Sequence, residues 1–110
     1  MQKCDLLYLN LSFIEQHYSE DISIEDISSS CGLNRSYFSK VFRDTMGESP
    51  QGFLLHYRMA RAAQLLTESR LPISTISTMV SYPNQLHFSR AFKNVYGISP
   101  RDYRAKHLAL

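Results

Sequence analysis

The chain has 110 residues, of which 44% are hydrophobic and 20% charged. This length suits one compact domain, or two half-domains sharing a core, and no low-complexity tract typical of disorder occurs. No apolar run approaches the roughly 20 residues of a membrane-spanning helix, and no signal peptide opens the chain. Its two cysteines, Cys4 and Cys31, lack the spacing of metal ligands. We therefore expect a reduced, cytoplasmic protein.

Charge is distributed unevenly along the chain, although the formal net charge is only +2. Residues 1–30 carry one Lys against six Asp or Glu, whereas residues 31–110 carry eleven Lys or Arg against four Asp or Glu. Such segregation predicts a basic face and an acidic back. On charge alone, an ordinary solvated surface is an equally good interpretation.

The amino-terminal third predicts two helices. Apolar residues between positions 6 and 18 are spaced as in a first helix. Ser23 is then expected to be the N-cap of a short helix that extends to about Cys31, with Asp26 at the third helical position. Gly32 follows, and it supplies the left-handed residue that a tight link between helices often needs.

Two longer helices follow this turn. Asn34 is predicted to cap a helix of about residues 35–46, which ends at Gly47. Ser49-Pro50 then marks the start of a helix that runs to about Glu68, because proline is favoured at the first helical position. Apolar residues occur all round this last helix, so we expect it to pack on several sides.

The carboxy-terminal part predicts the same kinds of element again. Pro72-Ile73 opens a short helix, Pro83-Asn84 breaks it, and a longer helix of about residues 84–96 ends at Gly97. Ser99-Pro100 caps a last short helix. The predicted fold is all-α, with about seven helices and two helix-turn-helix motifs joined by a long central helix. The corresponding subdomains are residues 1–48, 49–69 and 70–110.

The chain repeats itself with an offset of about fifty residues. Four positions recur 49 residues later: Ile24, Ile27, Cys31 and Leu33 as Ile73, Ile76, Val80 and Tyr82. Five recur 50 residues later: Phe38, Phe42, Gly47, Ser49 and Pro50 as Phe88, Phe92, Gly97, Ser99 and Pro100. One structural unit is therefore used twice. Because its counterpart is Val80, Cys31 is expected to be a small buried residue.

The two longer helices of the repeat each have an apolar side and a polar side on a helical wheel. The residues expected to face inward are Phe38, Val41, Phe42 and Thr45 in the first, and Phe88, Ala91, Phe92 and Val95 in the second. Cations recur on the opposite side, Lys40 with Arg90 and Arg43 with Lys93. A solvated surface is the commoner interpretation of any one such residue. Their recurrence favours DNA recognition, since long cations reach phosphates and guanine edges.

The predicted DNA-binding residues lie on these two helices or directly before them. They are Asn34, Arg35, Ser36, Ser39, Lys40, Arg43, Asn84, Gln85, Leu86, Ser89, Arg90 and Lys93. Leu86 is the apolar exception, and a thymine methyl group is one partner that suits it. We expect Arg90 to contact a base edge and Lys93 a phosphate.

The central helix sets an expected spacing between the two recognition helices. About 19 residues span roughly 28 Å at about 1.5 Å per residue, and the major groove repeats roughly every 34 Å. Recognition helices at about 35–46 and 84–96 are therefore predicted to enter successive major grooves of one asymmetric site.

Several motifs carry a resemblance to a known family. In the second half they are Arg58-x-x-Arg61-Ala62-x-x-Leu65-Leu66, Ile73-x-x-Ile76, Phe88-Ser89-Arg90-x-Phe92-Lys93 and Gly97-Ile98-Ser99-Pro100-x-x-Tyr103-Arg104; in the first half, residues 31–42. The stretch of about residues 13–104 thereby resembles the DNA-binding domain of the AraC/XylS family of bacterial transcription regulators. The resemblance implies two helix-turn-helix motifs joined by one long helix.

This resemblance raises two structural questions. The family usually has Gly-Phe at the second turn, where this chain has Ser81-Tyr82. Either Ser81 adopts the turn geometry, or the turn is shifted. Full-length relatives typically carry a separate regulatory domain, so the chain is either a stand-alone member or, as we expect, an excised carboxy-terminal domain.

Other functions are weaker interpretations. His17, His56, His87 and His107 are scattered, and no nucleophile elbow accompanies them, so no enzyme is predicted. Without close Cys or His pairs, no metal or cofactor is expected. A helical protein-interaction adaptor that uses the acidic amino-terminal helices is the alternative, but it does not explain the recurring cations. The predicted partners are double-stranded DNA and, for a transcription activator, RNA polymerase. The sequence leaves activation and repression open, and the isolated domain is expected to be monomeric.

Overall fold

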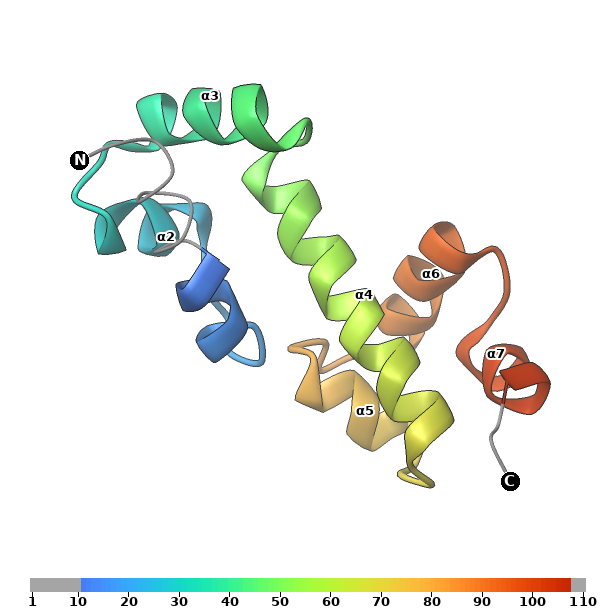
Figure 1. Cartoon of the computed structure of the whole chain (residues 1–110). Helices are drawn as coiled ribbons and strands as arrows, with labels where there is room; N and C mark the ends of the chain where they lie inside the picture. Colours follow the sequence, from blue (N-terminus) through green and yellow to red (C-terminus); the bar gives the residue numbers. More distant parts are fainter. Residues whose placement is uncertain (1–10, 108–110) are drawn as a thin grey trace. The chain divides into compact units, whose positions relative to one another are not determined.

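The computed structural model describes residues 11–107, and its regular structure in this range is entirely helical (Figure 1). Residues 11–17 form a helix. It is followed by α2 (Ile24–Ser30), α3 (Arg35–Met46), α4 (Pro50–Glu68), α5 (Ile73–Met79), α6 (Gln85–Tyr96) and α7 (Pro100–His107). The all-α prediction with about seven helices is confirmed. Residues 6–10 of the predicted first helix lie outside the described range.

The chain divides into two compact units, residues 1–55 and 56–110. The boundary falls within α4, so the first unit holds α2, α3 and the start of α4, and the second holds the rest of α4 with α5, α6 and α7. The partition into residues 1–48, 49–69 and 70–110 stays a prediction. None of the helices in the described range combines the length and apolar character of a membrane span.

The first unit has its own core, formed where α2 packs against α3. Ile14 and Ile27 are fully buried, and Phe38 and Phe42 are each 1% exposed. The ring of Phe42 meets that of Phe53, at the start of α4, edge to face with a centroid distance of 5.5 Å. Burying these side chains contributes about 1.5–3 kcal/mol each to folding, which fixes α3 on its neighbours.

The second unit repeats this arrangement with α5, α6 and α7. Phe88 and Phe92 are fully buried, and the ring of Phe92 meets that of Tyr103, on α7, edge to face with a centroid distance of 5.3 Å. Arg104 also binds the end of α4: its Nε donates to the Leu66 carbonyl at 3.0 Å. This bond satisfies a carbonyl in the last turn of α4 and holds α7 against it.

Helix starts follow the predicted caps. The Ser23 hydroxyl accepts from the Asp26 N–H at 3.1 Å, and the Asp26 carboxylate accepts from the Ser23 N–H at 2.8 Å. Ser49 and Ser99 act alike at α4 and α7, since each hydroxyl accepts, at 3.1 Å, from the N–H three residues later. The start of α4 and the whole of α7 are therefore equivalent, and the repeated unit extends into a third helical element.

Two predicted core positions are wrong. Thr45 is exposed, because it lies in the last turn of α3, beyond the part of the helix that is packed; its hydroxyl donates to the Val41 carbonyl at 2.8 Å. Cys31 is only partly buried, whereas its counterpart Val80 is fully buried. The Cys31 sulfur lies 3.7 Å from the hydroxyl of Ser30, which is itself exposed, so Cys31 borders solvent at the end of α2.

Candidate nucleic-acid interface

The first helix-turn-helix pair consists of α2, the turn at Gly32 and α3. Gly32 has a φ of +70°, which costs glycine little because it lacks a Cβ. Its N–H donates to the Ser29 carbonyl at 3.0 Å, and the Leu33 N–H donates to the Ser28 carbonyl at 3.1 Å. These bonds close the turn and direct the chain from α2 into α3.

The second pair, α5 and α6, has the same turn with a different residue. Ser81 has a φ of +67° and is the only non-glycine residue with a positive φ in the described range. Its N–H donates to the Thr78 carbonyl at 3.0 Å, and the Tyr82 N–H donates to the Ser77 carbonyl at 2.9 Å. Both bonds match those of the first turn at an offset of 49 residues. Ser81 therefore adopts the turn geometry, and the turn is not shifted.

A buried serine lies beside each of these turns, and neither was predicted from the sequence. Ser28 is 2% exposed and its hydroxyl donates to the Glu25 carbonyl at 3.1 Å. Ser77 is 1% exposed and its hydroxyl donates to the Tyr82 carbonyl, across the second turn. Their separation of 49 residues was the available signal, since it equals the offset of the surrounding apolar positions.

Asparagine caps the second helix of each pair. The Asn34 Oδ1 accepts from the Tyr37 N–H at 2.9 Å, and the Asn84 Oδ1 accepts from the Leu86 and His87 N–H groups at 2.9 and 3.1 Å. Both residues were predicted as DNA contacts, but only Asn34 was predicted as a cap; Asn84 was expected to break the preceding helix and is found to cap α6 as well. Capping engages the carbonyl oxygen of each amide, so a DNA contact by either residue falls to its NH₂ group, a donor suited to phosphate oxygens.

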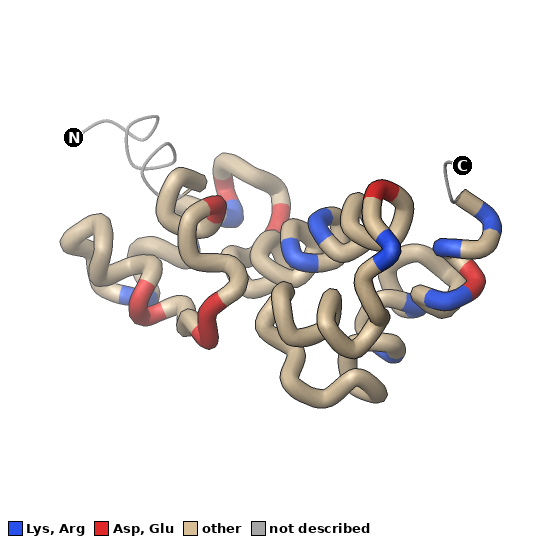
Figure 2. Tube along the Cα trace, turned by 90° about the horizontal axis from the view of Figure 1, so that it is seen from below, with Lys and Arg blue, Asp and Glu red and all other residues tan. Residues whose placement is uncertain are grey.

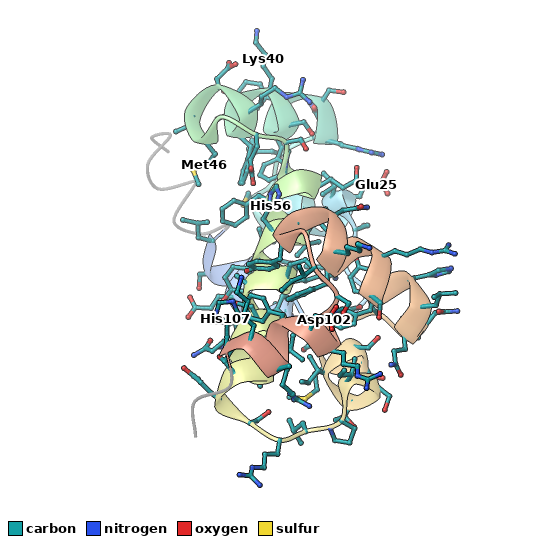
Figure 3. All side chains as sticks on the ribbon, turned by 90° about the vertical axis from the view of Figure 1, so that its right-hand side faces the viewer. Glu25, Lys40, Met46, His56, Asp102 and His107 are labelled. Atoms are coloured by element: carbon teal, nitrogen blue, oxygen red, sulfur yellow. The ribbon has the colours of Figure 1, made fainter. Side chains whose placement is uncertain are left out.

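On α3, the predicted DNA contacts form a polar surface. Ser36, Lys40 and Arg43 are exposed, and Ser39 is partly buried. Figure 3 shows the Lys40 side chain extending away from the helix. Arg35 is also exposed, but its charge is already paired, because its Nη1 lies 3.2 Å from Glu25 Oε1. Both partners are more than half exposed, and such surface pairs contribute only about 0.2–1 kcal/mol, so a phosphate can displace Glu25.

On α6, the predicted contacts are exposed in the same way. Gln85, Leu86, Arg90 and Lys93 are exposed, and Ser89 is partly buried, like Ser39 in the first copy. No carboxylate in the described part of the chain pairs with Lys40, Arg43, Arg90 or Lys93. Their charges are thus available to an anionic partner.

Below this surface, aromatic rings fix the carboxy-terminal half of α6. Tyr96 stacks on Phe92 at a centroid distance of 4.6 Å and lies 5.2 Å from Tyr103. Burial, and to a lesser extent Tyr103, raise the pKa of Tyr96 above its usual value of 10.0, so this phenol is neutral at pH 7. The end of α6 therefore contributes packing and no negative charge.

The two units differ in charge, as Figure 2 shows. Residues 11–55 carry three Lys or Arg against seven Asp or Glu, and residues 56–107 carry eight against two. Opposite charge raises the local concentration of a polyanion, so the second unit attracts phosphate more strongly than the first. No group of three or more acidic, His or Cys side chains in residues 11–107 is placed to hold a metal ion.

Comparison with known proteins places the chain among regulators. Residues 27–106 match the family model described as a helix-turn-helix domain. The chain is 36% identical over 93 residues to the probable transcriptional regulator LumQ of Photobacterium leiognathi. This match covers 84% of this chain and 38% of that protein. The chain is 37% identical over 94 residues to the lactose operon transcription activator of Staphylococcus xylosus, covering 86% and 34%. The chain therefore spans little more than a third of these relatives.

A solved structure agrees with this placement. The carboxy-terminal domain of AraT, a response regulator from Geobacillus stearothermophilus, superposes with a TM-score of 0.91 at 31% identity. The match covers 96% of this chain and 88% of that domain. Sequence and fold thus point to the same group of proteins.

Proposed function

The chain belongs to the AraC/XylS family of helix-turn-helix transcription regulators, and we propose that it reads one asymmetric DNA site with two recognition helices, α3 and α6. Sequence-specific DNA binding is the activity of this domain, which has no enzymatic role. The proposal adds that both motifs contact bases, in successive major grooves. The observation that carries it is the equivalence of the two turns.

This equivalence extends beyond the turns to the helices that follow them. Each turn leads to an asparagine-capped helix of 12 residues that exposes two cations without acidic partners. In helix-turn-helix proteins the second helix enters the major groove, and its first residues contact base edges. Two such helices in one chain, with different side chains, suit a site without internal symmetry.

We assign each predicted contact a role by its chemistry. Arg90 contacts a guanine edge, flanked by Gln85 and Ser89, whose amide and hydroxyl bond base edges. Lys93, nearer the end of α6, contacts a phosphate. On α3, base edges fall to Ser36, Ser39 and Lys40, and phosphates to Arg43 and, after release from Glu25, to Arg35. Asn34 and Asn84 donate to phosphates beside the helix ends that they cap.

The wider role follows from the relatives. The match to a lactose operon transcription activator supports activation by this chain as well. Because a transcription activator acts on RNA polymerase, we propose this enzyme as the protein partner. We place this activity in the cytoplasm, where bacterial DNA lies, and propose that the isolated domain binds DNA as a monomer. An adaptor that uses only the acidic residues of the first unit leaves the recurring cations without a role.

Binding to duplex DNA over a range of salt concentrations tests the proposed interface. If about six phosphates are contacted, log K falls against log salt with a slope of roughly −5. A heparin-like acidic polymer is the matched competitor, because it offers charge without base edges. A flat salt profile, or equal affinity for DNA and the polymer, would refute the proposed DNA interface and favour the protein-interaction adaptor.

A further inference from the structure

Leu86 is the most exposed large apolar side chain in the described part of the chain. It is 59% exposed, whereas the other exposed apolar side chain of α6, Tyr96, is 37% exposed and stacks on Phe92. The exposed part of this side chain gains nothing from folding, since the hydrophobic contribution requires removal of apolar surface from water. Its position on the outer side of a recognition helix points to a partner outside the chain.

The backbone around Leu86 is held in place. Asn84 caps α6 by accepting from the N–H groups of both Leu86 and His87. Leu86 thus lies in the first turn of α6, the part of a recognition helix that contacts base edges. Because the cap fixes the backbone of this turn, binding has to order only the Leu86 side chain, which favours a specific contact over a loose one.

We propose that Leu86 contacts the C5 methyl group of a thymine and makes the α6 half of the site dependent on that methyl. This inference rests on the proposed function, because it requires α6 to lie in the major groove. The thymine methyl is the apolar group that a base pair presents there, and it suits an aliphatic side chain that can form no hydrogen bond.

The neighbours of Leu86 predict where the thymine lies. Arg90 is four residues further along, so the two side chains share one side of the helix. Four residues rise about 6 Å along the axis, which corresponds to about two base pairs of DNA. The thymine read by Leu86 and the guanine read by Arg90 should therefore be within about two base pairs of each other.

The first motif offers an internal contrast. Its residue equivalent to Leu86 is Ser36, which is also exposed on the first turn of its helix but carries a hydroxyl. A hydroxyl bonds base edges and gains little from a methyl group. Dependence on the thymine methyl should accordingly be confined to the half of the site that α6 reads.

Uracil substitution tests this contact, because replacing thymine by uracil removes one methyl group and leaves base pairing unchanged. Each thymine of the preferred duplex is replaced in turn, and the dissociation constant is measured by fluorescence anisotropy at one salt concentration. The wild-type chain should bind about three- to fivefold more weakly when one particular thymine of the α6 half is replaced, as expected for one buried methyl group. Leu86→Ala should bind both duplexes equally.

Met79→Ala is the matched control, since Met79 is 40% exposed on α5 and lies outside the recognition helix. It should keep the full difference between thymine and uracil. Uracil tolerated by the wild type at every position, or a difference that persists in Leu86→Ala, overturns the contact. So does a change in stoichiometry with Leu86→Ala, which would assign the leucine to a second copy of the chain. Absence of any preferred duplex would instead refute the proposed function.

Discussion

Exchanging the two turn residues, Gly32→Ser and Ser81→Gly, measures the cost of the left-handed serine. The turns share their backbone hydrogen bonds, and a Cβ built on Gly32 would meet no atom within 4 Å. Steric contact is therefore absent, and the effect comes from backbone conformation. The left-handed conformation destabilises a non-glycine residue by about 1–2 kcal/mol. Glycine avoids this cost, but ordering its more flexible backbone on folding costs about 0.5–1 kcal/mol, which offsets part of the gain. We expect Ser81→Gly to stabilise by about 0.5–1 kcal/mol, and Gly32→Ser to destabilise by a similar amount.

Urea denaturation followed by circular dichroism provides the assay. The midpoints should shift in opposite directions at constant slope, because neither change alters the surface exposed on unfolding. Ser81→Ala is the control, since it removes the hydroxyl and keeps the positive φ, and should not stabilise. A loss of stability with Ser81→Gly, or an equal gain with Ser81→Ala, would refute the argument that conformation alone separates the two turns.

The remaining predictions concern the core, the interface and a cap. Phe42→Ala and Phe92→Ala should each lower the free energy of unfolding by about 3–5 kcal/mol in urea denaturation; a loss below about 1 kcal/mol would contradict their burial. Arg90→Ala should leave stability within about 0.5 kcal/mol, weaken binding by about 1–3 kcal/mol and relax specificity at one position. Lys93→Ala should weaken binding to all duplexes and lower the salt slope by about one; the opposite assignment would mean that α6 is rotated in the groove. Asn84→Ala should cost about 1 kcal/mol in thermal unfolding, and no loss would show that water replaces the cap.

Local signals in the sequence predicted much of the fold. The Ser23–Asp26 capping box and the helix ends at Gly47 and Gly97 depend on a few neighbouring residues, so their chemistry is visible in the sequence. Local signals do not determine the conformation of Ser81, because serine permits either a left-handed or an ordinary turn. What settles it is the surrounding fold, which demands the same chain reversal that Gly32 makes.

The candidate site was predictable in outline only. Helical periodicity indicates which side of α6 is polar, and the exposed positions of Arg90 and Lys93 agree with it. The pairing of Arg35 with Glu25 joins residues on different helices, and periodicity within one helix contains no information on it. The prediction that Thr45 faces inward was wrong for a related reason, since periodicity does not reveal where the packing partner of a helix ends.

Selection of bound duplexes from a random pool tests most directly whether two motifs in one chain read one asymmetric site. The account predicts a consensus without internal symmetry, in which two blocks of specified bases are separated by about 10 base pairs. Repeating the selection with Arg90→Ala should reduce the base specificity of one block and leave the other unchanged. A palindromic consensus, or a single block that Arg90→Ala does not alter, would contradict the claim that α6 reads bases.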